Sequence, residues 1–348
     1  MIANVLVCCQ MLKGPVLGRA RFGLAGAGCP TVARPSFEVV IEMKQKRGFV
    51  LGKREEEILK AVYFYRYMTA LDVSCLLYSV SSLAHVRGML SELAGGGDYV
   101  ENEYLYRFPL QSGGGNRVRV FTLGSRGRDF FKTELEYPVT WYFRPDKVRH
   151  LSLGHLMHNL ILTRFLVSAK MWARRRVDFR LLEVRTCYEM SSGDYPSVEM
   201  VREGKREQVS VIPDAWALFE VLEDGKWFAA PLLLEIDRGT AYKNKFKEHI
   251  ASRLEFVREG GVYSRLFGRR EVMIAYLTTG ETEGFRESRR RAMCMWAREA
   301  LMEANKESWA SLFRFGSVAF EKVYDGSLFE DAVWYRPGSE TPVGLFAG

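Results

Sequence analysis

The sequence predicts an α+β fold in two parts, a helical part that closes with a β-hairpin and a larger part built on a mixed sheet. Stretches with apolar residues at helical spacing alternate with short runs rich in β-branched and aromatic residues. Of the 348 residues, 47% are hydrophobic and 26% are charged, which is typical of a globular chain with a substantial core. This length is enough for two domains, and no apolar run approaches the length of a membrane span.

The first part, expected over residues 49–131, has the element order of a winged helix-turn-helix. Helical patterns occupy 53–69, 70–79 and 81–93, and a run of glycines ends the third. A hairpin pattern follows, with "YVENEYLYRFPL" and "RVRVFTLGSRGRDFF" on either side of the tip "QSGGGN". In such a domain the third helix enters the major groove of DNA and the hairpin lies over the backbone.

Donor side chains on the third helix and the hairpin are the candidate DNA contacts, because they suit phosphates and base edges. They are Ser81, Ser82, His85, Arg87, Arg107, Arg117 and Arg119. The 50 lysines and arginines exceed the 42 acids, and the net charge of +8 favours an anionic partner. Two alternatives remain open, a winged helix used for protein contacts and an ordinary solvated helix face.

The second part is expected over residues 151–325, after an irregular, proline-containing linker at 132–150. Its pattern predicts the order αβββαβα with a mixed sheet, and residues 326–348 are expected as a tail. The expected elements are a helix at 151–176, strands at 179–190, 209–221 and 226–237, a helix at 241–258, a strand at 270–280, a helix at 285–304 and an edge strand at 314–323.

Three acids lie on two of these expected strands, with Asp214 near the middle of the strand at 209–221. Glu235 and Asp237 end the apolar run "PLLLEID" on one face, and pairing of neighbouring strands brings Asp214 alongside. Clustered carboxylates suit Mg²⁺, which activates water and stabilises charge on a phosphate. Lys243 and Lys247 on the following helix are within reach of the cluster. The alternative is structural, with the acids acting as helix caps and ion-pair partners.

This arrangement is similar to the restriction-endonuclease-like, PD-(D/E)xK superfamily. "IPDAWALFE" supplies the Pro-Asp at Pro213 and Asp214, and Glu235 matches the second acid. Where the superfamily usually has a lysine, this chain has Asp237, so Lys243 or Lys247 would have to replace it. The resemblance implies a restriction-endonuclease-like αβββαβ domain, a Mg²⁺ site formed by the three acids and a catalytic lysine.

A closer resemblance covers residue 53 to about residue 300. "ILKAVYFYRYMTALDVSCLLY", "RGMLSEL", "FTLGSRGRDFF", "HLMHNLILTRFL", "IPDAWALFE" and "LLLEIDRGT" resemble the replication-relaxation family of plasmids and integrated mobile elements. His158 falls at that family's helix histidine, where a core or capping role is expected. The resemblance implies a protein that binds double-stranded DNA through a winged helix and acts on it or remodels it.

The partners expected from this resemblance are double-stranded DNA, a second copy of the chain, and replication or mobilisation proteins of the same element. The expected location is the cytoplasm, on the nucleoid or a plasmid. Two further functions stay open. One is a Mg²⁺-dependent nuclease or nickase, and the other is a transcriptional regulator with an inert C-terminal domain.

The remaining features carry no function. None of the six cysteines forms a C-x-x-C pair, which predicts reduced thiols in a cytoplasmic protein. "GLAGAG" follows no credible strand and is not a nucleotide-binding loop, so a metabolic enzyme of that kind is not indicated. Residues 1–48 are expected to be either a disordered leader or the result of a start codon placed too early, with Met43 as the alternative start.

Overall fold

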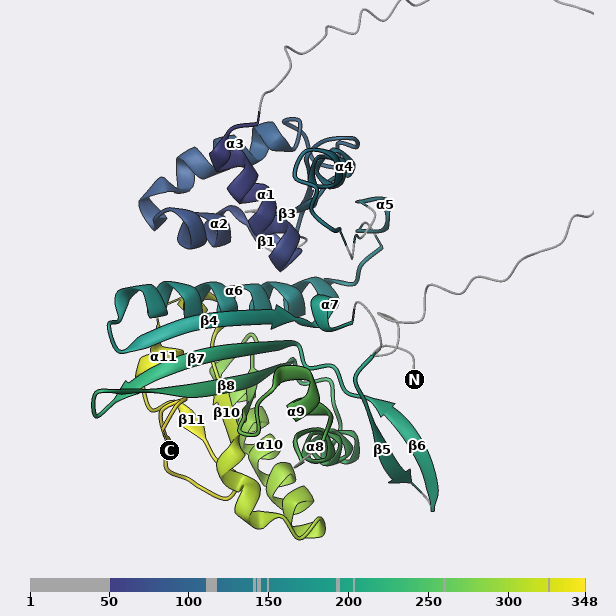
Figure 1. The fold of residues 1–348 in the computed structure, drawn as a ribbon, viewed down its shortest axis with the longest axis vertical. Helices are drawn as coiled ribbons and strands as arrows, with labels where there is room; N and C mark the ends of the chain where they lie inside the picture. Colours follow the sequence, from purple (N-terminus) through teal and green to yellow (C-terminus); the bar gives the residue numbers. More distant parts are fainter. Residues whose placement is uncertain are drawn as a thin grey trace, which may run out of the picture. The chain divides into compact units, whose positions relative to one another are not determined.

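Helices and several sheets make up the part of the chain that the structure describes, which confirms the α+β class (Figure 1). The computed structural model describes residues 51–110, 118–139, 142, 145–148, 150–191, 195–202, 204–258, 261–324 and 326–347. The expected leader over residues 1–48 lies outside the described residues. Within them, no helix is both long and apolar enough to cross a membrane.

The N-terminal part combines short helices with a three-stranded antiparallel sheet in the order β1-β3-β2. Its elements are α1 (Lys53–Tyr65), β1 (Met68–Thr69), α2 (Ala70–Leu77), η1 (Val80–Ser82), α3 (Leu83–Leu93), β2 (Leu105–Pro109), β3 (Arg119–Leu123) and α4 (Ser125–Thr133). Helix α2 begins sharply because the Thr69 and Asp72 side chains cap each other's backbone N–H groups.

One expectation for this part needs correction. The hairpin was expected to continue through "SRGRDFF", but the strand ends at Leu123 and α4 follows Gly124. Phe131 of α4 is fully buried, so the segment packs as an amphipathic helix rather than as a strand.

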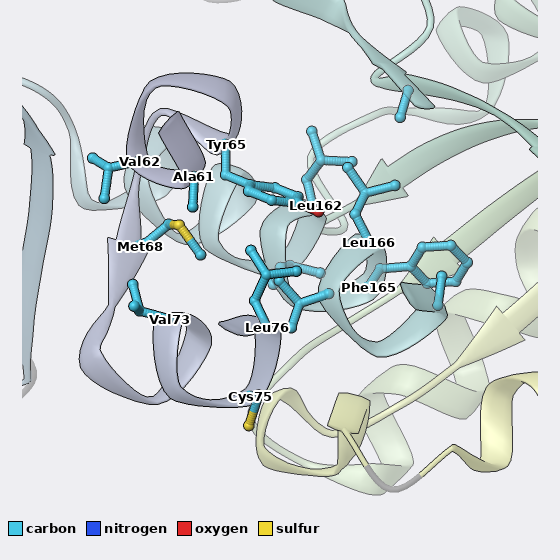
Figure 2. Close-up of a cluster of buried hydrophobic side chains, with 14 of the residues drawn as sticks. Ala61, Val62, Tyr65, Met68, Val73, Cys75, Leu76, Leu162, Phe165 and Leu166 are labelled. Atoms are coloured by element: carbon cyan, nitrogen blue, oxygen red, sulfur yellow. The ribbon is translucent and has the colours of Figure 1, made fainter. Parts of the chain in front are cut away.

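Helix α6 (Leu153–Arg175) joins the two predicted parts in a common core. It is buried around most of its circumference, as its apolar sequence requires. Figure 2 shows Tyr65 and Leu76 of the N-terminal helices directed toward Leu162, Phe165 and Leu166 of α6. The same hydrophobic cluster continues into the large sheet, and residues 50–348 form one compact unit.

A buried polar contact supports this joint. Asp72 at the start of α2 is completely buried, and the Arg164 guanidinium of α6 lies 3.8 Å from its carboxylate. The Tyr324 hydroxyl of η3 (Phe320–Tyr324) donates to the same carboxylate, and Arg164 also donates to the Phe320 carbonyl at 3.0 Å. Because a buried charge needs such partners, the contact fixes α2 against α6.

The large sheet has six strands in the order β11-β10-β9-β8-β7-β4. The β4, β7 and β8 strands are antiparallel neighbours, β8, β9 and β10 run parallel, and β11 is antiparallel to β10. The strands are β4 (Phe179–Thr186), β7 (Ala215–Glu223), β8 (Lys226–Asp237), β9 (Met273–Thr278), β10 (Phe313–Ser317) and β11 (Trp334–Tyr335).

Helices cover both faces of this sheet (Figure 1). Alternation along β8 directs Leu232 and Leu234 into the cluster with α6, while Leu233 joins the cluster on the other face. That second face is covered by α8 (Lys243–Val257), α9 (Val262–Phe267) and α10 (Glu283–Glu303). The chain order from α6 to β9 is therefore αβββαβ, apart from two short insertions.

The insertions and the C-terminus differ from the expected pattern. The polar loop after β4 contains α7 (Cys187–Met190) and a separate hairpin of β5 (Ser197–Arg202) and β6 (Lys205–Ser210). The strand expected at 209–221 is broken because Pro213 has no N–H to continue a ladder. Residues 326–347, expected as a tail, contain α11 (Ser327–Glu330) and β11, and Trp334 and Leu345 are fully buried.

Candidate functional site

The three candidate acids lie where β7 begins and β8 ends. Asp214 immediately precedes β7, and the pairing of Ala215 with Leu234 places it beside the last residues of β8. Its Oδ2 accepts a hydrogen bond from the Ile236 backbone N–H at 2.8 Å. Asp214 was expected near the middle of a strand at 209–221, but it lies just before β7. The antiparallel pairing of β7 with β8, which the sequence predicted, still brings it beside the end of β8.

Each acid is bound by its own basic side chain. The His158 ring Nε2 of α6 lies 3.0 Å from Asp214 Oδ1. The Arg253 Nε of α8 donates to Glu235 Oε1 at 2.6 Å. Arg289 of α10 donates two hydrogen bonds to the Asp237 carboxylate, and Asp237 Oδ2 also accepts one from the Gly239 N–H at 3.0 Å. The Nε–Oδ2 and Nη2–Oδ1 distances are 2.8 and 2.9 Å.

These pairs differ in their access to water. The Glu235 and Arg253 side chains are 8% and 2% exposed, so this pair belongs to the interior. His158 and Asp214 are 29% and 19% exposed, so their pair is the more open one. The Glu235–Arg253 pair therefore has a structural role only, whereas the His158–Asp214 pair is also accessible to solvent.

Burial and pairing shift the pKa values of these groups in different directions. Burial raises the pKa of Glu235 to about 7, even though the Arg253 charge opposes the rise, and the Asp214 charge adds to it. Burial also disfavours the Asp214 carboxylate, but the His158 partner and the Ile236 N–H outweigh it and lower the pKa of Asp214. For His158, burial opposes protonation, yet Asp214 raises the pKa of the ring.

This arrangement does not fit a magnesium site. Glu235 and Asp237 bind helices on one face of the sheet, whereas Asp214 binds α6 on the other. Both Asp214 oxygens already accept hydrogen bonds, and both Asp237 oxygens contact Arg289. Among the residues that the structure describes, no three His, Cys, Asp or Glu side chains are grouped to hold a metal ion.

The two candidate lysines lie away from the acids. Lys243 Nζ donates to Glu299 of α10 at 2.9 Å, and Lys247 pairs with Glu299 and Glu303. Phe246 is the buried residue of this helical turn, so the neighbouring lysines are directed along α10 rather than toward the strand ends. The structure thus gives both lysines a surface ion-pair role between two helices.

Sequence reasoning missed the two arginines that complete the site. Arg253 lies on the apolar stripe of α8, spaced at helical intervals from Phe246, Ile250 and Val257. An arginine on such a stripe needs a buried acid, and this signal was available in the sequence. Arg289 belongs to a run of three arginines, in which Arg290 is buried against Glu287 and Arg291 is exposed, so the sequence alone does not show which of them binds Asp237.

The candidate DNA-binding residues differ in their exposure to solvent. His85, Arg87 and Ser81 are exposed and Ser82 is half-buried. Arg119 is 49% exposed and pairs with Asp98 at 3.2 Å. Arg117 lies outside the described residues.

Arg107 requires a correction, because its side chain is only 10% exposed. Its guanidinium pairs with Asp98 at 2.7 Å and donates to Ser91 Oγ at 3.1 Å and to the Gly96 carbonyl at 2.9 Å. It therefore ties β2 to the turn after α3 and is not available to a phosphate.

Comparison with models of protein families, with curated proteins and with solved structures gave no match to the chain.

Proposed function

We propose that this chain is a DNA-binding protein of the replication-relaxation type, which holds double-stranded DNA with α3 and the β2–β3 hairpin. The observation that carries the proposal is the topology of the N-terminal part. A short strand between the first two helices pairs with the second strand of a later hairpin, giving the sheet order β1-β3-β2. This is the order of a winged helix-turn-helix, in which the helix before the hairpin reads DNA.

The exposed surface of α3 supports the same role. His85 and Arg87 are exposed donors, and Arg87 can form paired hydrogen bonds with a guanine edge or bind a phosphate. Ala84 and Gly88 are also exposed, and their small size allows a helix to approach a groove closely. Glu92 is exposed toward the C-terminal end, so the N-terminal half of α3 is the half suited to DNA.

The second part of the chain supports the replication-relaxation assignment. The α6-β4-β7-β8-α8-β9 order is similar to that of the restriction-endonuclease-like domains. The two motif segments that carry the family resemblance, around Asp214 and around Glu235, are in direct contact through the Ile236 N–H. Such a protein would act in the cytoplasm on a plasmid or integrated element, and it would bind DNA without a metal-dependent step.

The test is DNA binding by fluorescence anisotropy over a range of salt concentrations. Wild type should bind duplex DNA with a strong salt dependence. Arg87→Ala should weaken binding by roughly 1–3 kcal/mol, and the salt slope should fall by about 1 if Arg87 contacts a phosphate. His85→Ala should also weaken binding.

The matched control is Lys226→Ala, which removes an exposed cation at the turn between β7 and β8. It should bind as wild type. Duplex binding that is absent, or that survives Arg87→Ala and His85→Ala unchanged, would contradict the proposal.

A plasmid assay separates this function from the nuclease alternative. Supercoiled plasmid is incubated with the protein in Mg²⁺, Mn²⁺ or EDTA, beside Asp214→Asn and Glu235→Gln variants. We expect no metal-dependent nicks, because each acid is bound by a basic side chain. Nicks that need metal and disappear in both variants would establish the nuclease instead.

A further inference from the structure

Two loops meet at the carboxyl ends of the parallel strands β8 and β9. Asp237 is in register with Thr278, so residues 238–242 and 279–282 leave the sheet at the same edge. The Thr279 N–H donates to the Asp237 carbonyl at 3.2 Å, which keeps the two loops adjacent. In open α/β sheets, this edge is where ligands are commonly bound.

Two aromatic side chains are exposed at these loops. Tyr242 is 83% exposed, and Phe285 at the start of α10 is 46% exposed. Phe285 packs on both loops, because a Cβ at Gly239 would lie 2.5 Å from its Cζ and one at Gly280 would also collide with its ring. The two glycines therefore allow the Phe285 ring to lie over the loop backbone.

Helix formation does not account for Tyr242. It occupies the N-cap of α8, where Ser, Thr, Asp or Asn is preferred because a short polar side chain bonds the first N–H groups. The Tyr242 side chain makes no such bond, and its hydroxyl has no hydrogen-bond partner among the described residues. A local rule broken by an exposed aromatic residue is typical of a functional position.

Cations accompany the aromatic pair on the α8 side. Lys245 is exposed and has no ion-pair partner in the described part of the chain, and Lys243 is 46% exposed beside Glu299. Cations in the first turn of a helix oppose its dipole, so they do not stabilise α8. Glu281 on the other loop and Glu283 at the start of α10 are exposed and disfavour a phosphate there. An anionic strand is therefore best accommodated along Lys245.

We propose that Tyr242, Phe285 and Lys245 form a binding surface for single-stranded DNA. Unpaired bases would stack on the two rings, and Lys245 would bind the phosphate between them. Stacking on aromatic side chains beside a cation is how proteins hold single strands without reading their sequence. A duplex does not offer this contact, because its base faces are covered within the stack. The inference rests on the proposed function and adds a second DNA contact, distinct from α3.

The test is binding of a labelled oligothymidine of about 16 nucleotides, which is long enough for one such surface. Tyr242→Ala should weaken binding roughly 5- to 150-fold, as expected for the loss of one stacked base. Lys245→Ala should weaken it and reduce its salt dependence, whereas Tyr242→Phe should bind as wild type because the ring is kept.

Phe228→Ala is the matched control, since Phe228 is 50% exposed at the opposite end of β8. It should leave oligothymidine binding unchanged. Equal losses in Phe228→Ala and Tyr242→Ala would overturn the proposal, and so would wild-type affinity in Tyr242→Ala.

Duplex binding separates this inference from the proposed function. Tyr242→Ala should bind duplex as wild type, and Arg87→Ala should retain oligothymidine binding. A wild-type protein that binds duplex but not oligothymidine refutes only the single-strand surface, and the exposed rings would then suit a protein partner. A wild-type protein that binds oligothymidine but not duplex refutes the role of α3. A wild-type protein that binds neither refutes both.

Discussion

Arg253→Met is the substitution that tests the interior of the site most directly. Arg253 Nε donates to Glu235 at 2.6 Å, and its Nη2 lies 3.4 Å from the Ile212 carbonyl oxygen. Methionine fills similar space but provides neither charge nor donor. The substitution therefore leaves the Glu235 carboxylate, which is 8% exposed, without its cation.

The expected loss follows from this burial. Removing one partner of a buried pair costs about 3–5 kcal/mol, because the other charge stays uncompensated. Exposed pairs contribute about 0–1 kcal/mol. Arg258→Met is therefore a suitable control, since Arg258 follows the same helix and its pair with Glu255 is 3.2 Å long with a 66% exposed arginine.

The loss should depend on pH. Burial raises the pKa of folded Glu235 to about 7 from an ordinary value of 4.5. Between these values the folded protein holds more protons than the unfolded one, so this group's contribution to stability falls as pH rises. Because Arg253 opposes the rise in pKa, its removal extends this effect to higher pH. The Arg253→Met penalty should thus be large at about pH 8 and smaller near pH 5, where Glu235 is neutral.

Urea unfolding at both pH values, followed by far-UV circular dichroism, measures these free energies. We expect Arg253→Met to lose several times more stability than Arg258→Met at the higher pH. The double variant Glu235→Leu/Arg253→Met should recover much of the loss, because it leaves no buried charge unpaired. A penalty for Arg253→Met no larger than that of Arg258→Met, or one that grows toward pH 5, would refute the reasoning.

Four other outcomes follow from the structure. The pKa of folded His158 is raised from 6.5, so the stability that this group contributes is complete below pH 6.5 and is lost as pH rises through the folded pKa. The pKa of folded Asp214 is lowered from 3.8, so the stability that it contributes is complete above pH 3.8 and is lost as pH falls through the folded pKa. His158→Asn should therefore cost most between these limits in a urea series over pH. Gly124→Ala should cost about 1–3 kcal/mol, because its Cβ would collide with a backbone carbonyl, whereas Gly88→Ala meets nothing within 4 Å and should stabilise the helix by about 0.5–1 kcal/mol. Trp334→Ala should cost about 3–5 kcal/mol in the same assay, because its side chain is fully buried. Mg²⁺ should leave the melting temperature unchanged relative to EDTA. A rise in melting temperature with Mg²⁺ that Asp214→Asn abolishes would contradict the interpretation that the three acids are held by basic side chains and bind no metal.

The three ion pairs also explain how the end of β8 is held. Arg253 of α8 and Arg289 of α10 bind acids on β8 itself. His158 of α6 binds Asp214, which accepts a hydrogen bond from the Ile236 N–H of β8, so helices on both faces of the sheet are attached at this strand end. This cross-linking keeps the adjoining loops in place. The loops that carry Tyr242 and Phe285 are consequently attached to a rigid part of the fold.

Most secondary structure could be predicted because its signals are local. The apolar repeat of α8 and the continuous apolar run of β8 are visible in short windows of sequence. Errors occurred where two local readings competed. The glycine and charged residues before Phe131 allowed either a strand or a helix, and packing of the Phe131 ring selected the helix. Likewise, the polar sequence around β5 and β6 carries little periodicity, so pairing of the two strands decided their structure.

The C-terminal segment shows a similar limit. Its sequence after residue 325 has few apolar residues in any regular spacing. Trp334 and Leu345 nevertheless fill the core beside β10, because the rest of the sheet leaves an apolar surface there. Burial of this kind depends on the surface that receives the segment and has no signal within the segment itself.

The sequence by itself determined the α+β class, the order of the first helices and hairpin strands, and the position of Glu235 and Asp237 at the end of a strand. These features depend on sequence patterns that extend over only a few residues, so they can be recognised without the structure. Only the tertiary structure decided which cation binds each acid and that Lys243 and Lys247 bind α10 instead. The partners of the acids are 18 to 56 residues away in the chain. Their contact depends on the rotation of each helix against the sheet, which the packing of the whole core sets.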